Sequence, residues 1–313
     1  MSKHQKWLVN VSVATIWTSY QSAREMDQAA ICYPVRIREW LNALDYENRL
    51  ALCHQNLVQT QVLYGQEVLV VEEMGEWAKV LVLEQPSSKD EHGYPGWMPK
   101  CQLIQLSSWT IDQSPVARIK SNTAILHHLD SDQTLEISFQ TVLPLIEDLK
   151  DGIKVQTPTG AGVIKKEDAS IFSSLNAIPK GSGENIVSNG EQFLQLPYLW
   201  GGVSGFGYDC SGFSYSMCKA NGYVIPRDAH EQAVQGEKIQ LTEIMPGDLL
   251  FFAYEEGKGR IHHVGIYYGN GKMIHAPKTG KAVEIISLAG TDYETELCEA
   301  RRYWQEMEGK NGK

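Results

Sequence analysis

The chain has 313 residues, of which 42 % are hydrophobic, 9 % aromatic and 21 % charged. This balance excludes a disordered or collagen-like chain and is sufficient for two or three packed domains of roughly 100–200 residues each. The 38 acidic residues outnumber the 28 Lys and Arg residues, which gives a net charge of −10. This charge speaks against nucleic-acid binding, because neutralising phosphates needs clustered cations.

The N-terminal residues predict a strand and no export or membrane segment. Asn10 and Ser12 interrupt the apolar residues of this stretch, so it lacks the apolar run of ~7–15 residues that a secretion signal contains. No run in the chain approaches the ~20 apolar residues of a membrane-spanning helix. The six cysteines are scattered without a C-x-x-C pair. We therefore expect a reduced, cytoplasmic protein.

The first 108 residues are expected to form a β-rich domain with one helical insertion. Partly alternating apolar runs at residues 10–18, 61–71 and 77–83 predict strands, with turns at Tyr64-Gly65 and residues 73–76 and a closing strand from Trp97. After Pro34, apolar residues recur every three or four positions, at Val35, Ile37, Trp40, Leu41 and Leu44. This spacing is typical of an amphipathic helix.

Residues 109–178 are expected to form a second, shorter β unit. Its runs at residues 117–126, 135–145 and 152–163 repeat the order of the first unit. This weak internal repeat suggests two small SH3-like β-barrels. A Pro/Gly/Ser-containing linker at residues 178–183 places the main boundary there, so that residues 179–313 form the third domain.

The third domain is expected to be of the α+β class. Helices are predicted from Ser182 to about Leu196 and from Cys210 to Asn221, where Gly222 provides a stop signal. Five strands are then predicted at residues 249–252, 264–268, 272–275, 283–286 and 299–303. Helices followed by an antiparallel meander are typical of α+β folds.

Cys210 is the candidate nucleophile. It follows a glycine-rich turn and comes directly after Asp209, a candidate N-cap, so its sulfur would lie in the first turn of a helix. The unpaired N–H groups and the helix dipole favour the thiolate there, and the same N–H groups could stabilise an oxyanion. The competing interpretation is a helix that merely begins with Asp and Ser. The other five cysteines are interpreted as small buried side chains: Cys32, Cys53, Cys101, Cys218 and Cys298.

Two histidines are candidate partners of Cys210. If residues 269–271 form a hairpin loop, Gly265 lies opposite His275, and strand alternation places His263 and His275 on one face. One imidazole could then act as a base while the other orients it. His262 points to the opposite face. Five further histidines are expected at the surface: His4, His54, His92, His127 and His128. A zinc site made of Cys and His is the alternative, but no acidic ligand or H-x-x-x-H spacing accompanies them.

Six ordered motifs resemble the NlpC/P60 cysteine peptidases, which have a papain-like core. The resemblance covers about residues 183–306. The motifs are Leu196-Pro197-Tyr198-Leu199-Trp200-Gly201-Gly202, Asp209-Cys210-Ser211-Gly212-Phe213, Pro226-Arg227-Asp228, Pro246-Gly247-Asp248-Leu249, His263-Val264-Gly265-Ile266-Tyr267 and Ile274-His275-Ala276. The two N-terminal units resemble bacterial SH3 (SH3b) domains. The whole arrangement resembles the YkfC-type γ-D-glutamyl-L-diamino-acid endopeptidases of murein peptide recycling.

The resemblance implies a role for each matching residue. Cys210 would be the nucleophile, His263 the general base, His275 its orienting partner and Tyr198 a hydroxyl near the oxyanion. The implied substrate is a short murein peptide with a free N-terminal L-Ala, cleaved after γ-D-Glu and before L-Lys or meso-diaminopimelate. No metal or cofactor is implied, and we expect a monomer.

The resemblance also implies a pocket for the substrate's free amine, which needs carboxylates to offset its desolvation. On the peptidase side the matching residues are Asp209, Ser211 and Asp228; on the SH3b side we expect Tyr94 as an aromatic wall. Gln59, Glu67 and Glu91 remain candidates for a further partner, and Ala229 stands where a hydroxyl residue is expected. The competing structural interpretations are a helix cap for Asp209, an ion pair of Asp228 with Arg227, and core packing for Tyr198 and Trp200.

Three other functions compete with a cytosolic recycling peptidase. The first is an exported autolysin that acts on intact peptidoglycan. The second is a noncatalytic wall-binding protein, which the presence of Cys210 and His263 disfavours. The third is an acyltransferase of related fold. The circularly permuted relatives of that kind place His before Cys, whereas Cys210 precedes His263 here.

Overall fold

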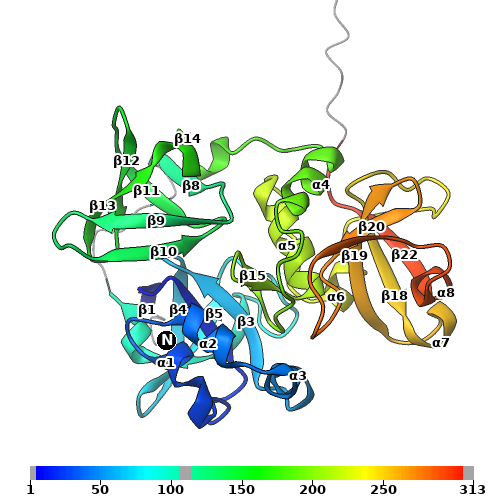
Figure 1. The fold of residues 1–313 in the computed structure, drawn as a ribbon, viewed down its shortest axis with the longest axis horizontal. Helices are drawn as coiled ribbons and strands as arrows, with labels where there is room; N and C mark the ends of the chain where they lie inside the picture. Colours follow the sequence, from blue (N-terminus) through cyan, green and yellow to red (C-terminus); the bar gives the residue numbers. More distant parts are fainter. Residues whose placement is uncertain (1–4, 106–110, 112–113, 306–313) are drawn as a thin grey trace, which may run out of the picture. The chain divides into compact units, whose positions relative to one another are not determined.

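The computed structural model describes residues 5–105, 111 and 114–305, which form two compact units (Figure 1). Unit 1 comprises the described residues of 1–84, 89–178 and 199–208. Unit 2 comprises those of 85–88, 179–198 and 209–313. His4 and the predicted boundary at residues 108 and 109 lie outside the described residues.

The first sheet of unit 1 has seven strands in the order β3-β2-β6-β5-β4-β1-β7. The predicted turn at Tyr64-Gly65 is confirmed: Gly65 adopts a φ of 76° and turns the chain between β3 and β4. The bounds are β1 (Gln5–Val9), β2 (Val13–Trp17), β3 (Val58–Leu63), β4 (Glu67–Met74), β5 (Trp77–Val82), β6 (Tyr94–Pro99) and β7 (Leu103–Ile104), with a 3₁₀ turn η2 (Lys100–Gln102) before β7.

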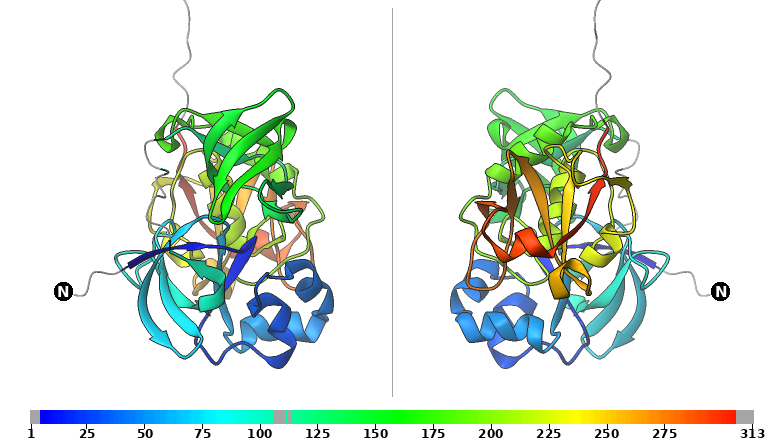
Figure 2. Two further views of the ribbon diagram at one scale, coloured as in Figure 1. Left: turned by 90° about the vertical axis from the view of Figure 1, so that its left-hand side faces the viewer. Right: turned by 90° about the vertical axis from the view of Figure 1, so that its right-hand side faces the viewer.

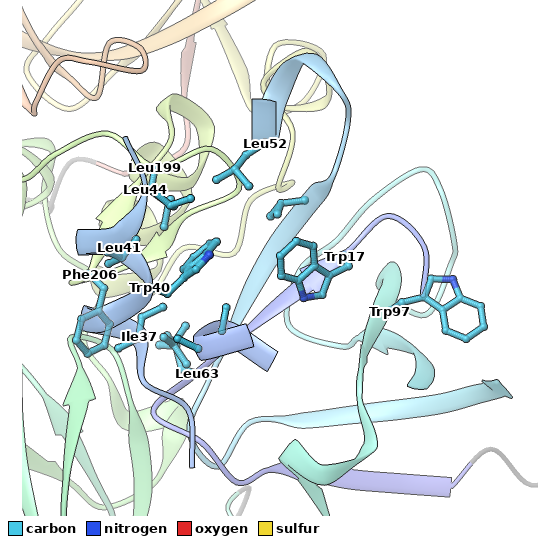
Figure 3. Packing of buried hydrophobic residues seen from close by; sticks show 14 residues of the cluster. Trp17, Ile37, Trp40, Leu41, Leu44, Leu52, Leu63, Trp97, Leu199 and Phe206 are labelled. Carbon is cyan, nitrogen blue, oxygen red and sulfur yellow. The ribbon is translucent and has the colours of Figure 1, made fainter. Parts of the chain in front are cut away.

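The helical insertion contains several short helices where the sequence predicts one. They are η1 (Glu25–Asp27), α1 (Gln28–Ile31), α2 (Ile37–Ala43) and α3 (Tyr46–His54), and they lie together as the blue helices of Figure 2. Asp45 separates α2 from α3, because its side chain caps α3 by accepting the Asn48 N–H at 2.8 Å. Trp40 of α2 is buried in the cluster of apolar side chains shown in Figure 3.

The second sheet of unit 1 also has seven strands, in the order β10-β9-β13-β12-β11-β8-β14. Each predicted run of residues 117–126, 135–145 and 152–163 is a pair of strands joined by a tight turn. The bounds are β8 (Val116–Ile119), β9 (Thr123–His128), β10 (Thr134–Ser138), β11 (Val142–Asp148), β12 (Gly152–Thr157), β13 (Gly160–Lys165) and β14 (Ala169–Phe172), with η3 (Lys166–Asp168) and η4 (Leu175–Ala177). Both sheets are SH3b-like, but among the described residues neither closes into the barrel that we predicted.

Residues 199–208 precede Cys210 in the sequence but belong to unit 1. They form a small hairpin of β15 (Val203–Ser204) and β16 (Gly207–Tyr208). The Trp200 indole N–H donates to the Val58 carbonyl at 2.9 Å. Leu199 and Phe206 pack into the same apolar cluster as Trp40 (Figure 3). The glycine-rich segment before the candidate nucleophile is thus held by the core of unit 1.

Unit 2 consists of helices and one antiparallel sheet, and the α+β class is confirmed. The sheet order is β17-β22-β18-β19-β20-β21. Its strands are β17 (Glu237–Ile239), β18 (Leu249–Ala253), β19 (Ile261–Gly269), β20 (Lys272–His275), β21 (Glu284–Ser287) and β22 (Leu297–Arg302), and its helices are α4 (Gly183–Glu191), α5 (Cys210–Ala220), α6 (Ala229–Gln232), α7 (Tyr254–Gly257) and α8 (Asp292–Glu296). The last strand, β22, returns between β17 and β18, so the sheet is not the simple meander that we predicted.

The five predicted strands and both predicted helices of unit 2 are present. Ser182 caps α4 by accepting the Asn185 N–H at 3.3 Å, and α4 ends at Glu191, earlier than predicted. Helix α5 packs against β19, which brings its first turn to the middle of the sheet. No helix within the described ranges is long and apolar enough to cross a membrane.

Candidate active site

Cys210 is the first residue of α5, directly after its N-cap. The Asp209 carboxylate accepts the Gly212 N–H at 2.6 Å and so holds the helix start in place. The backbone N–H groups of Val264 and Ser211 donate to the Cys210 sulfur, and both favour the thiolate. Because Val264 follows His263 in β19, the sulfur lies beside the backbone of the candidate base.

His263 and His275 form a hydrogen-bonded pair on neighbouring strands. The Nε2 atom of His263 lies 2.7 Å from the Nδ1 atom of His275. Ile266 pairs with Ile274, which confirms the predicted register, and a bulge lets Gly269 pair with Lys272 where we predicted a loop residue. A Cβ atom on Gly265 would lie 3.4 Å from the His275 Cβ, as expected for facing residues. Since the Nε2 atom of His263 is hydrogen-bonded to His275, only its Nδ1 atom could interact with Cys210.

The two rings are enclosed by aromatic side chains. Tyr293 of α8 lies 5.2 Å from the His263 ring and 5.3 Å from the His275 ring, measured between centroids. Phe252 of β18 lies 5.8 Å from His263. Sequence reasoning missed Tyr293, because no motif includes it and it lies on α8, a short helix between β21 and β22. His262 faces Glu296 at 3.1 Å and stacks on Tyr254, in agreement with its predicted position outside the pair.

Burial of Cys210 and His263 shifts both pKa values toward the uncharged forms, against the predicted preference for a thiolate. Burial, followed by the charge of Asp209, raises the pKa of Cys210 to about 12, although the two N–H groups and Arg227 lower it. Burial, followed by His275 and His262, holds the pKa of His263 well below its usual value. Cys210 still keeps 9 % of its surface exposed, so its sulfur is not sealed in the interior. These shifts favour a neutral thiol and a neutral imidazole at the site.

Asp209 and Ser211 are held by a buried arginine. The two terminal nitrogens of the Arg227 guanidinium donate to the Asp209 carboxylate, at 3.1 and 2.7 Å. One of them also donates to the Ser211 hydroxyl at 2.9 Å. Arg227 is 1 % exposed. It is therefore not part of a surface ion pair with Asp228, as one competing interpretation held. The Asp209 carboxylate also caps α5, so the cap and the ion pair already occupy much of its hydrogen-bonding capacity.

Asp228 and Tyr198 also lie in unit 2. Asp228 is half-buried at the N-cap of α6, and its carbonyl accepts the Glu231 N–H. Tyr198 is 6 % exposed, and its backbone N–H donates to Lys281 just before β21. Residues 195–198 thus run beside residues 281–283, at the edge of the sheet that carries the histidine pair.

Tyr94 lies in unit 1, on β6. Its ring is buried, and the Lys89 ammonium lies 4.0 Å above the ring centroid and also contacts the hydroxyl. Gln59 reaches the same hydroxyl at 3.4 Å. Lys89 therefore covers the face of the Tyr94 ring. Glu67 pairs with Lys6, and Glu91 is exposed.

The remaining cysteines and histidines of the described residues differ in how far they are buried. Cys218 is buried as expected, but Cys101 is exposed and Cys32, Cys53 and Cys298 are only half-buried, so four of the five burial predictions were wrong. These four lie near the ends of elements, where apolar sequence neighbours point elsewhere. His54, His92 and His127 are exposed, and His128 is half-buried. Within residues 5–105, 111 and 114–305, no group of three His, Cys, Asp or Glu residues could hold a metal ion.

Comparisons with known proteins identify the family of this chain. A model described as the NlpC/P60 family matches residues 195–302, and one described as the YKFC SH3b2 domain matches residues 119–172. The γ-D-glutamyl-L-lysine dipeptidyl-peptidase of Bacillus subtilis is 50 % identical over 295 residues, covering 94 % of this chain and 98 % of that protein. The Bacillus cereus protein of the same name is 40 % identical over 305 residues, covering 96 % and 92 %. A crystal structure of an NlpC/P60 family protein from Bacillus cereus has a TM-score of 0.94 at 39 % identity, covering 96 % of this chain and all of that one.

A cysteine at a helix start, beside a histidine pair on an antiparallel sheet, defines a cysteine peptidase. The chain belongs to the NlpC/P60 family.

Proposed function

We propose that this enzyme hydrolyses the bond between γ-D-Glu and L-Lys, or meso-diaminopimelate, in short murein peptides with a free N-terminal L-Ala. The observation that carries the proposal is the arrangement of Cys210, His263 and His275 in a chain that covers 98 % of a relative named for this reaction. The products are L-Ala-D-Glu and a peptide or amino acid that begins with the diamino acid.

In the first step of the proposed mechanism, His263 Nδ1 takes the thiol proton of Cys210 as the sulfur attacks the γ-carbonyl carbon of D-Glu. A carbon–sulfur bond forms, and the carbonyl electron pair moves onto oxygen. The N–H groups at the start of α5 support an oxyanion site beside the sulfur. Tyr198 is the proposed further donor to this oxygen.

In the second step, the oxyanion collapses and the carbon–nitrogen bond breaks. The His263 imidazolium gives its proton to the departing amine, and L-Ala-γ-D-Glu remains on Cys210 as a thioester. Water then attacks the thioester while His263 takes its proton. The carbon–sulfur bond then breaks, His263 returns the proton to the sulfur, and L-Ala-D-Glu leaves.

Recognition of the free amine is the second part of the proposal. Asp228 is a proposed carboxylate of this pocket, and it is half-buried at the N-cap of α6. Asp209 and Ser211 are proposed to shape the pocket beside Asp228. Tyr94 stays a proposed contact of the peptide, as an aromatic wall.

The proposed setting is cytoplasmic recycling of murein peptides by a monomer that binds neither membrane nor nucleic acid. Six free cysteines support a reducing compartment. The net charge of −10 supports the absence of nucleic-acid binding. The proposed domain division remains 1–108, 109–178 and 179–313, and the matched SH3b2 segment at residues 119–172 falls inside its second part.

The test is to incubate the enzyme with L-Ala-γ-D-Glu-L-Lys and with its N-acetylated form, and to quantify products by chromatography and mass spectrometry. We expect L-Ala-D-Glu from the free-amine peptide only. Cys210→Ala should abolish turnover, whereas Cys101→Ala, a change at an exposed thiol, should leave turnover intact. Equal turnover of both peptides would refute the amine requirement, and activity of Cys210→Ala would refute the peptidase mechanism.

A further inference from the structure

The His263–His275 hydrogen bond places a requirement on the outer nitrogen of His275. A neutral imidazole carries one N–H, so one ring of the pair donates and the other accepts. If His275 Nδ1 donated the hydrogen bond, His263 Nε2 would be the acceptor and the single proton of His263 would be on Nδ1. Nδ1 could then not accept the proton of Cys210. His263 can act as a base only when its Nε2–H donates to His275. The base role of His263 rests on the proposed function. It requires that His275 accept with Nδ1 and therefore carry its own proton on Nε2.

That N–H is buried. His275 is 0 % exposed, and its Nε2 atom has no hydrogen-bond partner among the described residues. A buried donor without a partner is costly, so the protein would favour the tautomer with the proton on Nδ1 unless an acceptor lies within reach of Nε2. The tautomer that the reaction needs therefore depends on a group beyond the pair.

Glu284 is that group. It is the first residue of β21 and pairs with His275 across the sheet. One of its carboxylate oxygens lies 3.7 Å from His275 Nε2, slightly too far for a hydrogen bond in the resting structure. The Glu284 side chain is 37 % exposed, so water can solvate its other oxygen. Other titratable groups that the described residues place near the pair include Cys210 from α5, Tyr293 from α8 and, beside His263, His262.

We propose that Glu284 is a positioning residue for the reaction, and that its carboxylate holds the His275 proton on Nε2 and balances the positive charge that His263 acquires. When His263 takes the thiol proton, its positive charge polarises His275 through the Nε2–H hydrogen bond. The distance between His275 Nε2 and the Glu284 carboxylate then shortens, and the Nε2–H donates to it. The relay runs from Cys210 through both histidines to Glu284, with no proton leaving His275. Carboxylates that orient a histidine from behind serve the same purpose in triads and metal sites.

The test compares Glu284→Gln with the wild type, and uses Glu237→Gln as a matched control at the opposite edge of the same sheet. With L-Ala-γ-D-Glu-L-Lys, Glu284→Gln should lose about tenfold in kcat with KM within twofold. The acid limb of its kcat/KM profile should move to lower pH, because the carboxylate no longer favours the imidazolium. A raised KM at unchanged kcat would reassign Glu284 to substrate binding and overturn the proposal.

A second readout does not depend on the substrate. Alkylation of Cys210 by iodoacetamide, followed at pH 7 by peptide mass spectrometry, should slow at least threefold in Glu284→Gln and stay unchanged in Glu237→Gln. If the wild type fails to cleave the tripeptide, the proposed substrate is wrong, and alkylation still decides the role of Glu284. If the tripeptide is cleaved and both variants match the wild type in kcat and alkylation, the role of Glu284 is refuted.

Discussion

Replacing Arg227 with methionine tests how the helix that carries the candidate nucleophile is held. The guanidinium makes two hydrogen bonds to Asp209 and one to Ser211, with side chains only 1 % and 7 % exposed in the ion pair. Removing one partner of a buried pair costs about 3–5 kcal/mol, because the other charge is left without compensation. The Gly212 N–H and the helix dipole still stabilise the Asp209 carboxylate, so we expect a cost of about 3 kcal/mol.

Differential scanning calorimetry measures this cost. At about 2–4 °C per kcal/mol, Arg227→Met should lower Tm by roughly 10 °C. The double variant Asp209→Asn with Arg227→Met removes the uncompensated charge and should recover part of the loss. Arg36→Met is the control, because Arg36 pairs with Glu39 at the surface, and its effect should stay within about 0.5 kcal/mol. A change in Tm below 2 °C for Arg227→Met, or a double variant less stable than the single one, would refute the reasoning.

Three further predictions concern the histidine pair and the helix contacts of unit 2. Burial lowers the pKa of His275 from 6.5 to about 4. Below pH 6.5 the unfolded chain binds a proton that the folded chain does not, so between pH 6.5 and 4 stability falls by roughly 3 kcal/mol from this group. His275→Asn should flatten that dependence in urea unfolding, and an unchanged slope would contradict it. His263→Ala should slow iodoacetamide alkylation of Cys210 at least about tenfold at pH 7, with recovery as pH rises; an unchanged rate at pH 7 would speak against His263 as the base. Gly183→Ala should lower the free energy of unfolding in urea by more than about 2 kcal/mol, because the added Cβ would overlap a backbone oxygen and Trp304. Ser188→Ala, at an exposed position of the same helix, should leave it unchanged. Equal effects of the two substitutions would contradict this prediction.

Local patterns were sufficient to predict the parts of the site that lie close together in the sequence. The residue before Cys210 is a good N-cap, and it caps α5 as predicted. His263 and His275 are joined by a short hairpin, so strand alternation determines that they share a face. The loop prediction was wrong by one residue, and the bulge at Gly269 compensated for it without changing the register.

Features that depend on packing between distant segments were not predictable from the sequence. Arg227 pairs with Asp209 across 17 intervening residues, and Tyr293 reaches the histidines from α8, a short helix 18 residues beyond His275 in the sequence. Neither contact follows from periodicity or capping signals. The same holds for the inclusion of residues 199–208 in unit 1 and of residues 85–88 in unit 2.

The predicted preference of Cys210 for the thiolate took no account of burial. The position at a helix start indicates the N–H groups and the dipole that favour a thiolate. It does not indicate how deeply the sheet buries the sulfur, nor that Asp209 adds a negative charge beside it. Burial is the larger effect in the structure, and it raises the pKa of Cys210 to about 12.

Trapping the covalent intermediate tests the mechanism most directly. A reaction with L-Ala-γ-D-Glu-L-Lys is quenched with acid within milliseconds to seconds, and the protein is then analysed by intact-mass and peptide mass spectrometry. We predict an L-Ala-D-Glu adduct on the peptide that contains Cys210, which disappears when the substrate is exhausted. Product release by the wild type with no adduct at any time, together with continued turnover by Cys210→Ser, would contradict a thioester pathway through this sulfur.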